Sequence, residues 1–251
     1  MSVDDSGNIH VTGKSWGSGT SFDYVTVKYN TNGKQLWAKR YIGPGNGDDI
    51  ARAIAVDKSG NVYVSGESKG SNSDFDYAVV KYSSAGKQLW VQRYDGPAMG
   101  PDWATAIAVD GSGNVTITGN SKNSGTDYDM ATIKYSADGQ QLWVQRYDGP
   151  GNADDEAAAI AVDASGNIYV TGQSEYAVTD NDPGAANYYN YYLTTIKYDS
   201  NGKLVWAKKY SWPGNACDYA TAIAVDKSGN VYVSGESKGS TTDWDYIAIK
   251  Y

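Results

Sequence analysis

The sequence is poor in the residues that most often build disulfides, metal sites and histidine-based active sites. Cys217 is its only cysteine and His10 its only histidine, so an internal disulfide and a zinc site with two histidines are both excluded. His10 is expected inside a strand, and Cys217 in a loop without a basic neighbour. That separation argues against a Cys–His nucleophile and favours a hydrogen-bonded strand histidine.

Long apolar runs and an excess of positive charge are also missing. No run approaches the roughly 18 apolar residues of a membrane-spanning helix, and residues 1–8 have neither the basic start nor the apolar core of a secretory signal. Lys and Arg number 21 against 29 Asp and Glu, which gives a formal net charge of −8. A surface of this sign does not attract phosphate backbones or anionic lipids. We therefore expect no nucleic-acid partner and no insertion into a membrane.

Tyrosine, tryptophan and glycine are abundant instead. The chain has 22 Tyr, 8 Trp and 29 Gly but only 2 Phe. This composition is typical of many half-buried strands joined by tight turns. The length of 251 residues lies within the range of one large all-β domain.

A fivefold internal repeat organises the chain. The triplet Ser-Gly-Asn places a glycine at Gly7, Gly60, Gly113, Gly166 and Gly229, so that three intervals are 53 residues and the last is ten residues longer. Nineteen residues at 53–71 return unchanged at 222–240. Within each unit, runs of the type AIAVD, NVYVSG, DYxxxKY and QLWVQRY follow in fixed order, bounded by Gly, Asn, Asp or Ser. Such runs predict four antiparallel strands per unit, called A to D here, and no segment has a helical period.

A period near 50 residues with four short strands predicts an all-β fold, a five-bladed β-propeller of four-stranded antiparallel blades. The single domain covers residues 1–251, and the first and last blades are expected to be incomplete. The five sheets are expected to close into a ring. Two arrangements stay open, a ring with a frayed seam and part of a longer array. The expected blades are residues 1–48, 49–101, 102–154, 155–217 and 218–251.

Bulky tryptophans recur in strand D of four units. In a propeller the blades splay apart toward the rim, where large rings are needed to fill the gap between them. We therefore interpret these residues as packing elements and not as a ligand site. They are Trp37, Trp90, Trp143 and Trp206.

The repeat unit resembles a known family. The pattern AIAVDxSGNxYVTG…DYxxxKYxxxGxxxW is similar to the β-propeller repeat, often labelled SBBP, of bacterial and archaeal cell-surface and secreted proteins, with looser similarity to NHL blades. The resemblance implies an extracellular or cell-envelope location and a binding or scaffolding role. It implies no common reaction, cofactor or set of catalytic residues.

The DxSGN turns allow two interpretations. Asp, Ser and Asn at alternate positions resemble the start of a calcium loop, but no Glu follows at a fixed offset to complete the ligand set. The structural alternative is that the Asp bonds its own turn while Gly takes the left-handed position, and we favour it. No metal and no cofactor is expected. The turns begin at Asp4, Asp57, Asp110, Asp163 and Asp226.

Acidic residues gather where the B–C and D–A connections should share one face of the disc. Asp49, Asp102, Asp155 and Asp218 precede strand A, and a second set, Asp23, Asp76, Asp129 and Asp245, opens strand C. The opposite face receives lysines instead. These aspartates are either candidate ligand contacts or caps of turns and strand ends.

The ten extra residues of the fourth unit fall in its B–C loop, on the same face. Such a loop suits stacking on sugar rings or seating a peptide, and the alternative is an Ω-like loop whose tyrosines pack on themselves. The candidate ligand-binding residues are Tyr176, Asp180, Asp182, Tyr188, Tyr189 and Tyr191, together with the four aspartates before strand A. Glu175 and Tyr192 belong to the same loop.

The sequence therefore predicts a non-catalytic propeller module that binds a glycan or a protein through this face, here called the loop face. The alternative is an enzyme similar to a glycoside hydrolase with carboxylates near the axis, for which Glu156 and Asp182 break the symmetry. A third possibility is a structural spacer in a surface protein. The sequence does not fix the oligomeric state.

Overall fold

The computed structural model describes residues 1–17, 21–71, 74–98, 100–123, 125, 127–150, 153–178, 188–212, 217–238 and 243–251, with backbone only at 177–178 and 188–189. All regular elements in these ranges are β-strands, arranged in five antiparallel sheets whose strands follow chain order. The all-β prediction is confirmed. No described segment forms a helix long and apolar enough to cross a membrane.

Each sheet is one blade, and each lies within the residue range expected for it. Blade 1 contains β1 (Ser2–Val3), β2 (Ile9–Trp16), β3 (Phe22–Tyr29) and β4 (Gln35–Tyr41). Blade 2 contains β5 (Asp49–Val56), β6 (Val62–Lys69), β7 (Phe75–Tyr82) and β8 (Gln88–Tyr94). Blade 3 contains β9 (Trp103–Val109), β10 (Val115–Lys122), β11 (Tyr128–Tyr135) and β12 (Gln141–Tyr147). Blade 4 contains β13 (Asp155–Val162), β14 (Ile168–Val178), β15 (Tyr188–Tyr198) and β16 (Leu204–Tyr210), and blade 5 contains β17 (Asp218–Val225), β18 (Val231–Lys238) and β19 (Trp244–Lys250).

The DxSGN turns connect strand A to strand B in the way the structural interpretation predicted. In blade 2, Asp57 Oδ1 accepts the backbone N–H groups of Ser59 and Asn61, each at 2.9 Å. Asp57 Oδ2 accepts the side-chain amide of Asn61 at 2.8 Å, and Gly60 has φ 77°, where a side chain would be strained. The same bonds recur in the other four turns, so each carboxylate holds its own turn together.

A bulge between strands A and B explains a second conserved feature of the repeat unit, the glycine of strand B. The A–B register shifts at Thr118/Gly119 in blade 3, and a Cβ on Gly119 would collide with Trp103 O. Gly13 occupies the same position in blade 1, where the short β1 does not reach it, and a Cβ there meets nothing within 4 Å. The bulge, and not the strand itself, therefore requires the glycine.

Consecutive blades pack through the same two surfaces, which we call the forward face and the rear face. In blade 2 the forward face comprises Tyr63, Tyr77, Val79, Trp90 and Tyr94, and it packs on the rear face of blade 3, which comprises Val115, Ile117, Ala131, Ile133 and Tyr135. The blades 1–2, 3–4 and 4–5 form equivalent apolar clusters. The core is thus a series of layers between the sheets.

The tryptophans of strand D connect neighbouring blades at the rim. Trp90 Nε1 donates to Ala137 O of the next blade at 3.0 Å, and its ring lies against Gly139 in the same turn. Trp37 and Trp143 make the same bond to Ser84 O and Ser200 O. Each tryptophan therefore packs across a blade boundary, as the sequence predicted.

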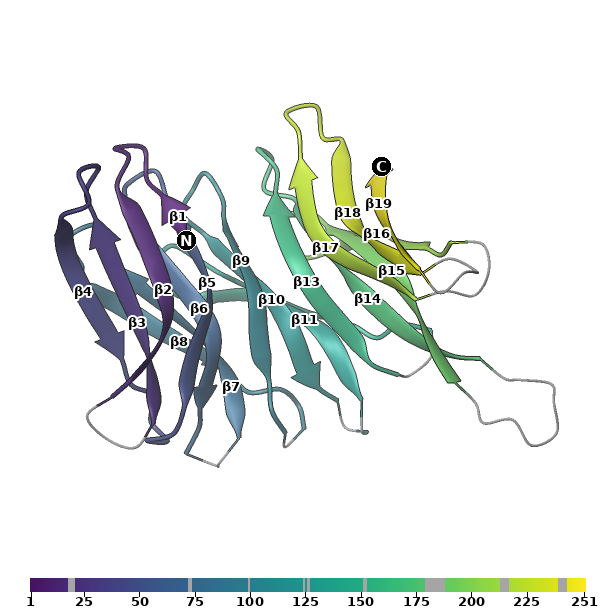
Figure 1. Cartoon of the computed structure of the whole chain (residues 1–251), viewed down its shortest axis with the longest axis horizontal. Helices are drawn as coiled ribbons and strands as arrows, with labels where there is room; N and C mark the ends of the chain where they lie inside the picture. The colour runs from purple at the N-terminus through teal and green to yellow at the C-terminus, as the bar shows by residue number, and fades with distance from the viewer. Residues whose placement is uncertain are drawn as a thin grey trace.

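The five blades follow one another as an open row with the N-terminus in the first and the C-terminus in the last (Figure 1). Within the described residues, substantial packing joins consecutive blades only. The rear face of blade 1 and the forward face of blade 5 are both exposed, with Val3 58% and Tyr246 76% accessible. The expected closure into a ring is therefore not seen in this arrangement.

Candidate functional site

The four aspartates that precede or open strand A are buried, although they were predicted as ligand contacts. Asp49, Asp102, Asp155 and Asp218 are at most 1% exposed. One oxygen of each carboxylate accepts a backbone N–H from the D–A connection, as Asp102 does from Gly96 at 2.6 Å and Asp218 from Trp212 at 3.0 Å. These residues therefore shape the loop face from below its surface, because one oxygen of each carboxylate bonds a backbone N–H that lies six residues earlier, in the D–A connection.

The aspartates of strand C are ion-pair partners in the first three blades. Asp76 Oδ2 lies 2.7 Å from Arg93 Nη2, and Asp129 Oδ2 lies 2.9 Å from Arg146 Nη2. Arg146 also donates to Ser121 O at 3.0 Å and to the hydroxyl of Tyr94 in the preceding blade at 3.2 Å. Arg93 and Arg146 therefore tie strand D to the B–C hairpin and to the preceding blade, whereas the bonds of Arg40 stay within blade 1.

Three carboxylates meet on the loop face between blades 3 and 4. Ligand oxygens of Asp129, Asp148 and Asp155 lie within 4.8 Å of one another. Burial, followed by the negative charges of Asp148 and Asp129, raises the pKa of Asp155 to about 6, and burial with Asp129 also raises the pKa of Asp148. Calcium takes six or more oxygen ligands, so this group supplies half of such a set.

The insertion of blade 4 lengthens the B–C hairpin. Strands β14 and β15 have 11 residues each where the equivalent strands have 7 or 8, and they pair out to Val178 and Tyr188. The described end of this two-stranded ribbon extends past the ends of the blade 5 strands beside it (Figure 1). Of the predicted residues, Tyr176 and Tyr191 lie in the ribbon, as does the backbone of Tyr188 and Tyr189, while Asp180 and Asp182 lie outside the described residues.

On one side of the ribbon, aromatic stacking replaces the ion pair found in blades 1, 2 and 3. Tyr192 occupies the position of Asp129, opposite a serine of strand B, and Lys209 occupies the position of Arg146. The Lys209 ammonium lies 5.5 Å from the centre of the Tyr192 ring, and Tyr176 stacks on Tyr192 at 3.9 Å with an angle of 10° between the rings. Tyr176, which was predicted as a ligand contact, therefore stacks on Tyr192 within the ribbon.

On the other side, the ribbon carries acidic and aromatic residues that contact blade 5. Glu175 accepts the hydroxyl of Tyr191 at 3.2 Å. The ring of Tyr191 lies 5.3 Å from that of Tyr219, which lies 5.4 Å from that of Trp244. Glu156, at the start of β13, accepts the amide of Gln173 at 2.7 Å. We call Glu156, Glu175, Tyr191, Tyr219 and Trp244 the acid–aromatic cluster.

The electrostatics of this cluster follow from crowded negative charge. Burial raises the pKa of Glu156, and the charges of Asp154 and Glu175 add to the effect. Burial and the neighbouring Glu175 carboxylate raise the pKa of Tyr191 to about 12. Its carboxylates are half-buried and Trp244 is 47% exposed. The cluster can accept hydrogen bonds or a positive charge and offers aromatic surface beside them.

Part of this cluster was missed by sequence reasoning. Glu156 was noted for breaking the symmetry, but Tyr219 and Trp244 were not, because they belong to the next unit in the chain. An alignment of the units, residue by residue, would have indicated the cluster, because the residue equivalent to Glu175 is a lysine in three other blades. These are Lys69, Lys122 and Lys238 of blades 2, 3 and 5.

The histidine and the cysteine do not form a site together. His10 is fully buried in blade 1, with Nε2 at 3.2 Å from Asp4 Oδ2. Cys217 lies beside blade 5, and its Sγ donates to Asn190 Oδ1 at 3.7 Å. Because blades 1 and 5 are at opposite ends of the row (Figure 1), a Cys–His pair within one chain is excluded.

Comparison with known protein families identifies the repeat. A family model described as a beta-propeller repeat, SBBP, matches residues 37–73, 143–175 and 214–240. The chain carries SBBP-type β-propeller repeats. The matched segments begin at the strand D tryptophan or in the D–A connection and end within strand B or just after it, so each includes a DxSGN turn and the glycine of strand B.

Similar proteins extend this finding to the fold. The regulatory protein FlaEY of Caulobacter vibrioides is 29% identical over 182 residues, which are 64% of this chain and 18% of FlaEY, so this chain spans less than a fifth of that relative. A crystal structure of a protein of unknown function from Dyadobacter fermentans matches with a TM-score of 0.53 and 8% identity over 98% of this chain and 76% of that one. The periplasmic gluconolactonase PpgL of Pseudomonas aeruginosa matches with a TM-score of 0.45 and 10% identity over 97% and 83% of the two chains. The likeness to the Dyadobacter protein concerns the fold alone.

Proposed function

We propose that this chain is a non-catalytic SBBP-type propeller module that binds a glycan or a protein through its loop face, at the acid–aromatic cluster. The observation that carries the proposal is the local reversal of charge. Where Lys69 and Lys122 lie over the aromatic rings of Phe75 and Tyr128 at 4.7 and 4.4 Å, blade 4 has Glu175 bonded to Tyr191.

The chemistry of the cluster supports binding of certain ligand groups. Two half-buried carboxylates favour a group that donates hydrogen bonds or carries a positive charge, because the groups that donate to them in this structure, Tyr191, Gln173 and the backbone N–H of Asp154, are all uncharged. Exposed aromatic rings beside them suit the apolar face of a sugar or the stem of a lysine or arginine side chain. A glycan with several hydroxyl donors and a basic protein segment both meet these requirements.

The test uses a variant that restores the residue found in three other blades. Glu175→Lys should fold normally and bind at least about tenfold more weakly, which corresponds to one lost charge-assisted contact. Asp138→Lys makes the same change of charge at an exposed turn on the opposite face and serves as the control. The probes are a glycan array and an array of basic peptides. Absence of binding to either array, or equal binding by the two variants, would contradict the proposal.

Glycoside hydrolysis is the second candidate, because Glu156 has the raised pKa that a general acid requires. This function predicts that Glu156→Gln abolishes turnover of aryl glycosides and leaves binding intact. The binding function predicts no turnover by either form. We also propose the extracellular or envelope location that the family resemblance implies, which fractionation of cells expressing the full-length protein checks.

A further inference from the structure

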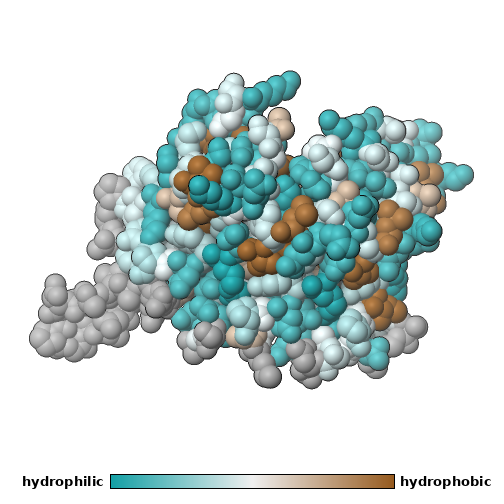
Figure 2. Space-filling model, turned by 180° about the vertical axis from the view of Figure 1, so that it is seen from behind, coloured by the Kyte–Doolittle hydropathy of each residue, from teal (hydrophilic) through white to brown (hydrophobic). Residues whose placement is uncertain are grey.

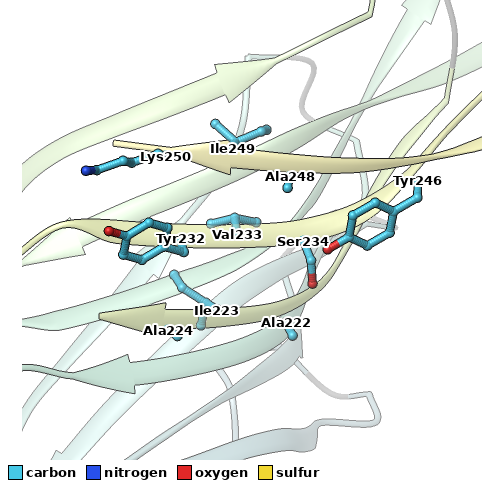
Figure 3. Close-up of a pocket in the computed structure, with 10 residues that line it drawn as sticks. All are labelled: Ala222, Ile223, Ala224, Tyr232, Val233, Ser234, Tyr246, Ala248, Ile249 and Lys250. Carbon is cyan, nitrogen blue, oxygen red and sulfur yellow. The ribbon is translucent and has the colours of Figure 1, made fainter. Parts of the chain in front are cut away.

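The forward face of blade 5 has the packing residues of the repeat, and none of the described residues covers it. Tyr232 and Tyr246 are 42% and 76% exposed, whereas the equivalent Tyr63 and Tyr77 of blade 2 are fully buried under blade 3. Strands β17, β18 and β19 form the floor of an open hollow of about 300 Å³ between these tyrosines (Figure 3). Ala222, Ala224 and Ala248 have small side chains, which leave the space above the strands open.

The rear face of blade 1 is the complementary surface. Val11 is 39% exposed, while the equivalent Val64 of blade 2 is fully buried against blade 1, and Val3 is 58% exposed. The back of the molecule differs from these two ends, because its apolar side chains form small separate patches among hydrophilic ones (Figure 2). The two ends of the row therefore present unpartnered sheet faces of the kind that pack inside it.

Every blade boundary within the chain joins a forward face to a rear face through apolar packing, and the first two boundaries add hydrogen bonds from tyrosine hydroxyl groups. Tyr24 Oη and Tyr77 Oη donate to the carbonyl oxygens of Ala78 and Ala131 in the next blade, at 3.4 and 3.3 Å. Tyr63 Oη donates to Gly113 O at 3.0 Å. These bonds fix the orientation of one blade on the next, in addition to the apolar burial.

A first blade from another copy offers acceptors at the equivalent positions. Val25 O corresponds to Ala131 O, and Gly7 O corresponds to Gly113 O, by the register of strands B and C and by the DxSGN turn. They would receive the hydroxyl groups of Tyr246 and Tyr232. The forward face of blade 5 therefore has the two tyrosines that bond across the boundary between blades 2 and 3, and it would continue the apolar packing formed at all four boundaries within the chain.

We infer that blade 5 of one molecule docks on blade 1 of a second copy, so that the rows join head to tail. The contact is heterologous, and it extends the row unless the rotation closes it. It is smaller than the internal boundaries, because blade 5 has no strand D among its described residues and the strand A of blade 1 is only β1. Association should therefore be reversible and depend on concentration.

The experiment is sedimentation velocity of the full chain over a range of concentrations. The wild type should shift from monomer to larger species as the concentration rises. Tyr246→Glu at one end and Val11→Glu at the other should each remain monomeric over the same range, because each places a charge in an apolar contact. Leu142→Ser changes an exposed apolar residue of strand D, 51% accessible, and should associate like the wild type.

Mixing the two charged variants distinguishes head-to-tail docking from any symmetric dimer. The Val11→Glu copy keeps an intact blade 5, and the Tyr246→Glu copy keeps an intact blade 1, so the mixture should form one good contact and stop at the dimer. This recovery also shows that both variants are folded. A wild type that stays monomeric, a variant that still associates, or a mixture that stays monomeric would each overturn the inference. A monomeric wild type with protected Tyr246 would show closure within one chain instead.

Discussion

Tyr63 and Tyr232 offer a matched test of how much of the stability comes from packing between blades. They occupy the same place in two identical segments of nineteen residues, 53–71 and 222–240, and both hydroxyls donate to the aspartate of their own turn, at 3.1 and 3.2 Å. Local strand propensity and turn chemistry are therefore the same. Their difference is burial, since Tyr63 is 0% and Tyr232 is 42% exposed.

The magnitudes follow from this difference. Truncating a fully buried aromatic residue to alanine costs about 3 to 5 kcal/mol, and Tyr63 also loses its bond to Gly113 O, worth about 1 kcal/mol. We expect Tyr63→Ala to lower the free energy of unfolding by about 4 kcal/mol. Tyr232→Ala should lower it by about 1 kcal/mol, because a partly exposed side chain with no next blade loses little packing.

Urea unfolding followed by tryptophan fluorescence measures both values, at protein concentrations where the wild type is monomeric. Tyr63→Phe and Tyr232→Phe refine the test, because only the first removes a hydrogen bond between blades and should cost about 1 kcal/mol. Equal losses for Tyr63→Ala and Tyr232→Ala would refute the reasoning, since they would show that burial by the next blade contributes nothing.

Three further predictions concern the loop face and the bulge. Burial raises the pKa of Asp155 from 3.8 to about 6, so the folded state binds a proton that the unfolded state releases between these two values. The free energy of unfolding should therefore fall by about 3 kcal/mol as the pH rises from 4 to above 6. Asp155→Asn should remove this part of the pH dependence in urea titrations. Gly119→Ala should lower the melting temperature strongly and Gly13→Ala hardly at all, because only the first Cβ meets backbone; similar shifts for both would be inconsistent with the bulge argument. Arg146→Met should cost about 3 to 5 kcal/mol by leaving Asp129 buried without its partner, and Asp129→Asn in the same chain should recover part of that loss, as thermal unfolding would show.

Much of the fold could be predicted from the sequence because its signals are local. Short alternating runs, DxSGN turns and glycines at fixed intervals specify strands and hairpins within each unit, and the structure has the same strands in the same order. The rim tryptophans were predictable for a related reason, since a large ring recurring once per unit has to pack between units.

The candidate site was less predictable, because its contacts cross between units. The aspartates before strand A looked like an acidic ring, but their carboxylates bond to the connections beside them and are buried. The insertion looked like a loop, but part of it continues the hairpin as β14 and β15. Tyr219 joins Tyr191 only because blade 5 packs on blade 4, which no pattern within one unit indicates.

The two identical segments, 53–71 and 222–240, separate what the sequence determines locally from what the packing of the blades determines. Both form strand A, a DxSGN turn and strand B with the same register and the same bulge, because these features depend on bonds within the unit. Burial does not follow from the same letters. Glu67 is 7% exposed and pairs with Arg52 at 2.8 Å, whereas Glu236 is exposed and blade 5 has Thr221 at the position of Arg52. Tyr63 is covered by blade 3 and Tyr232 is open to solvent, since hydrophobic burial is a property of what packs against a residue and only the stacking of the blades supplies that neighbour.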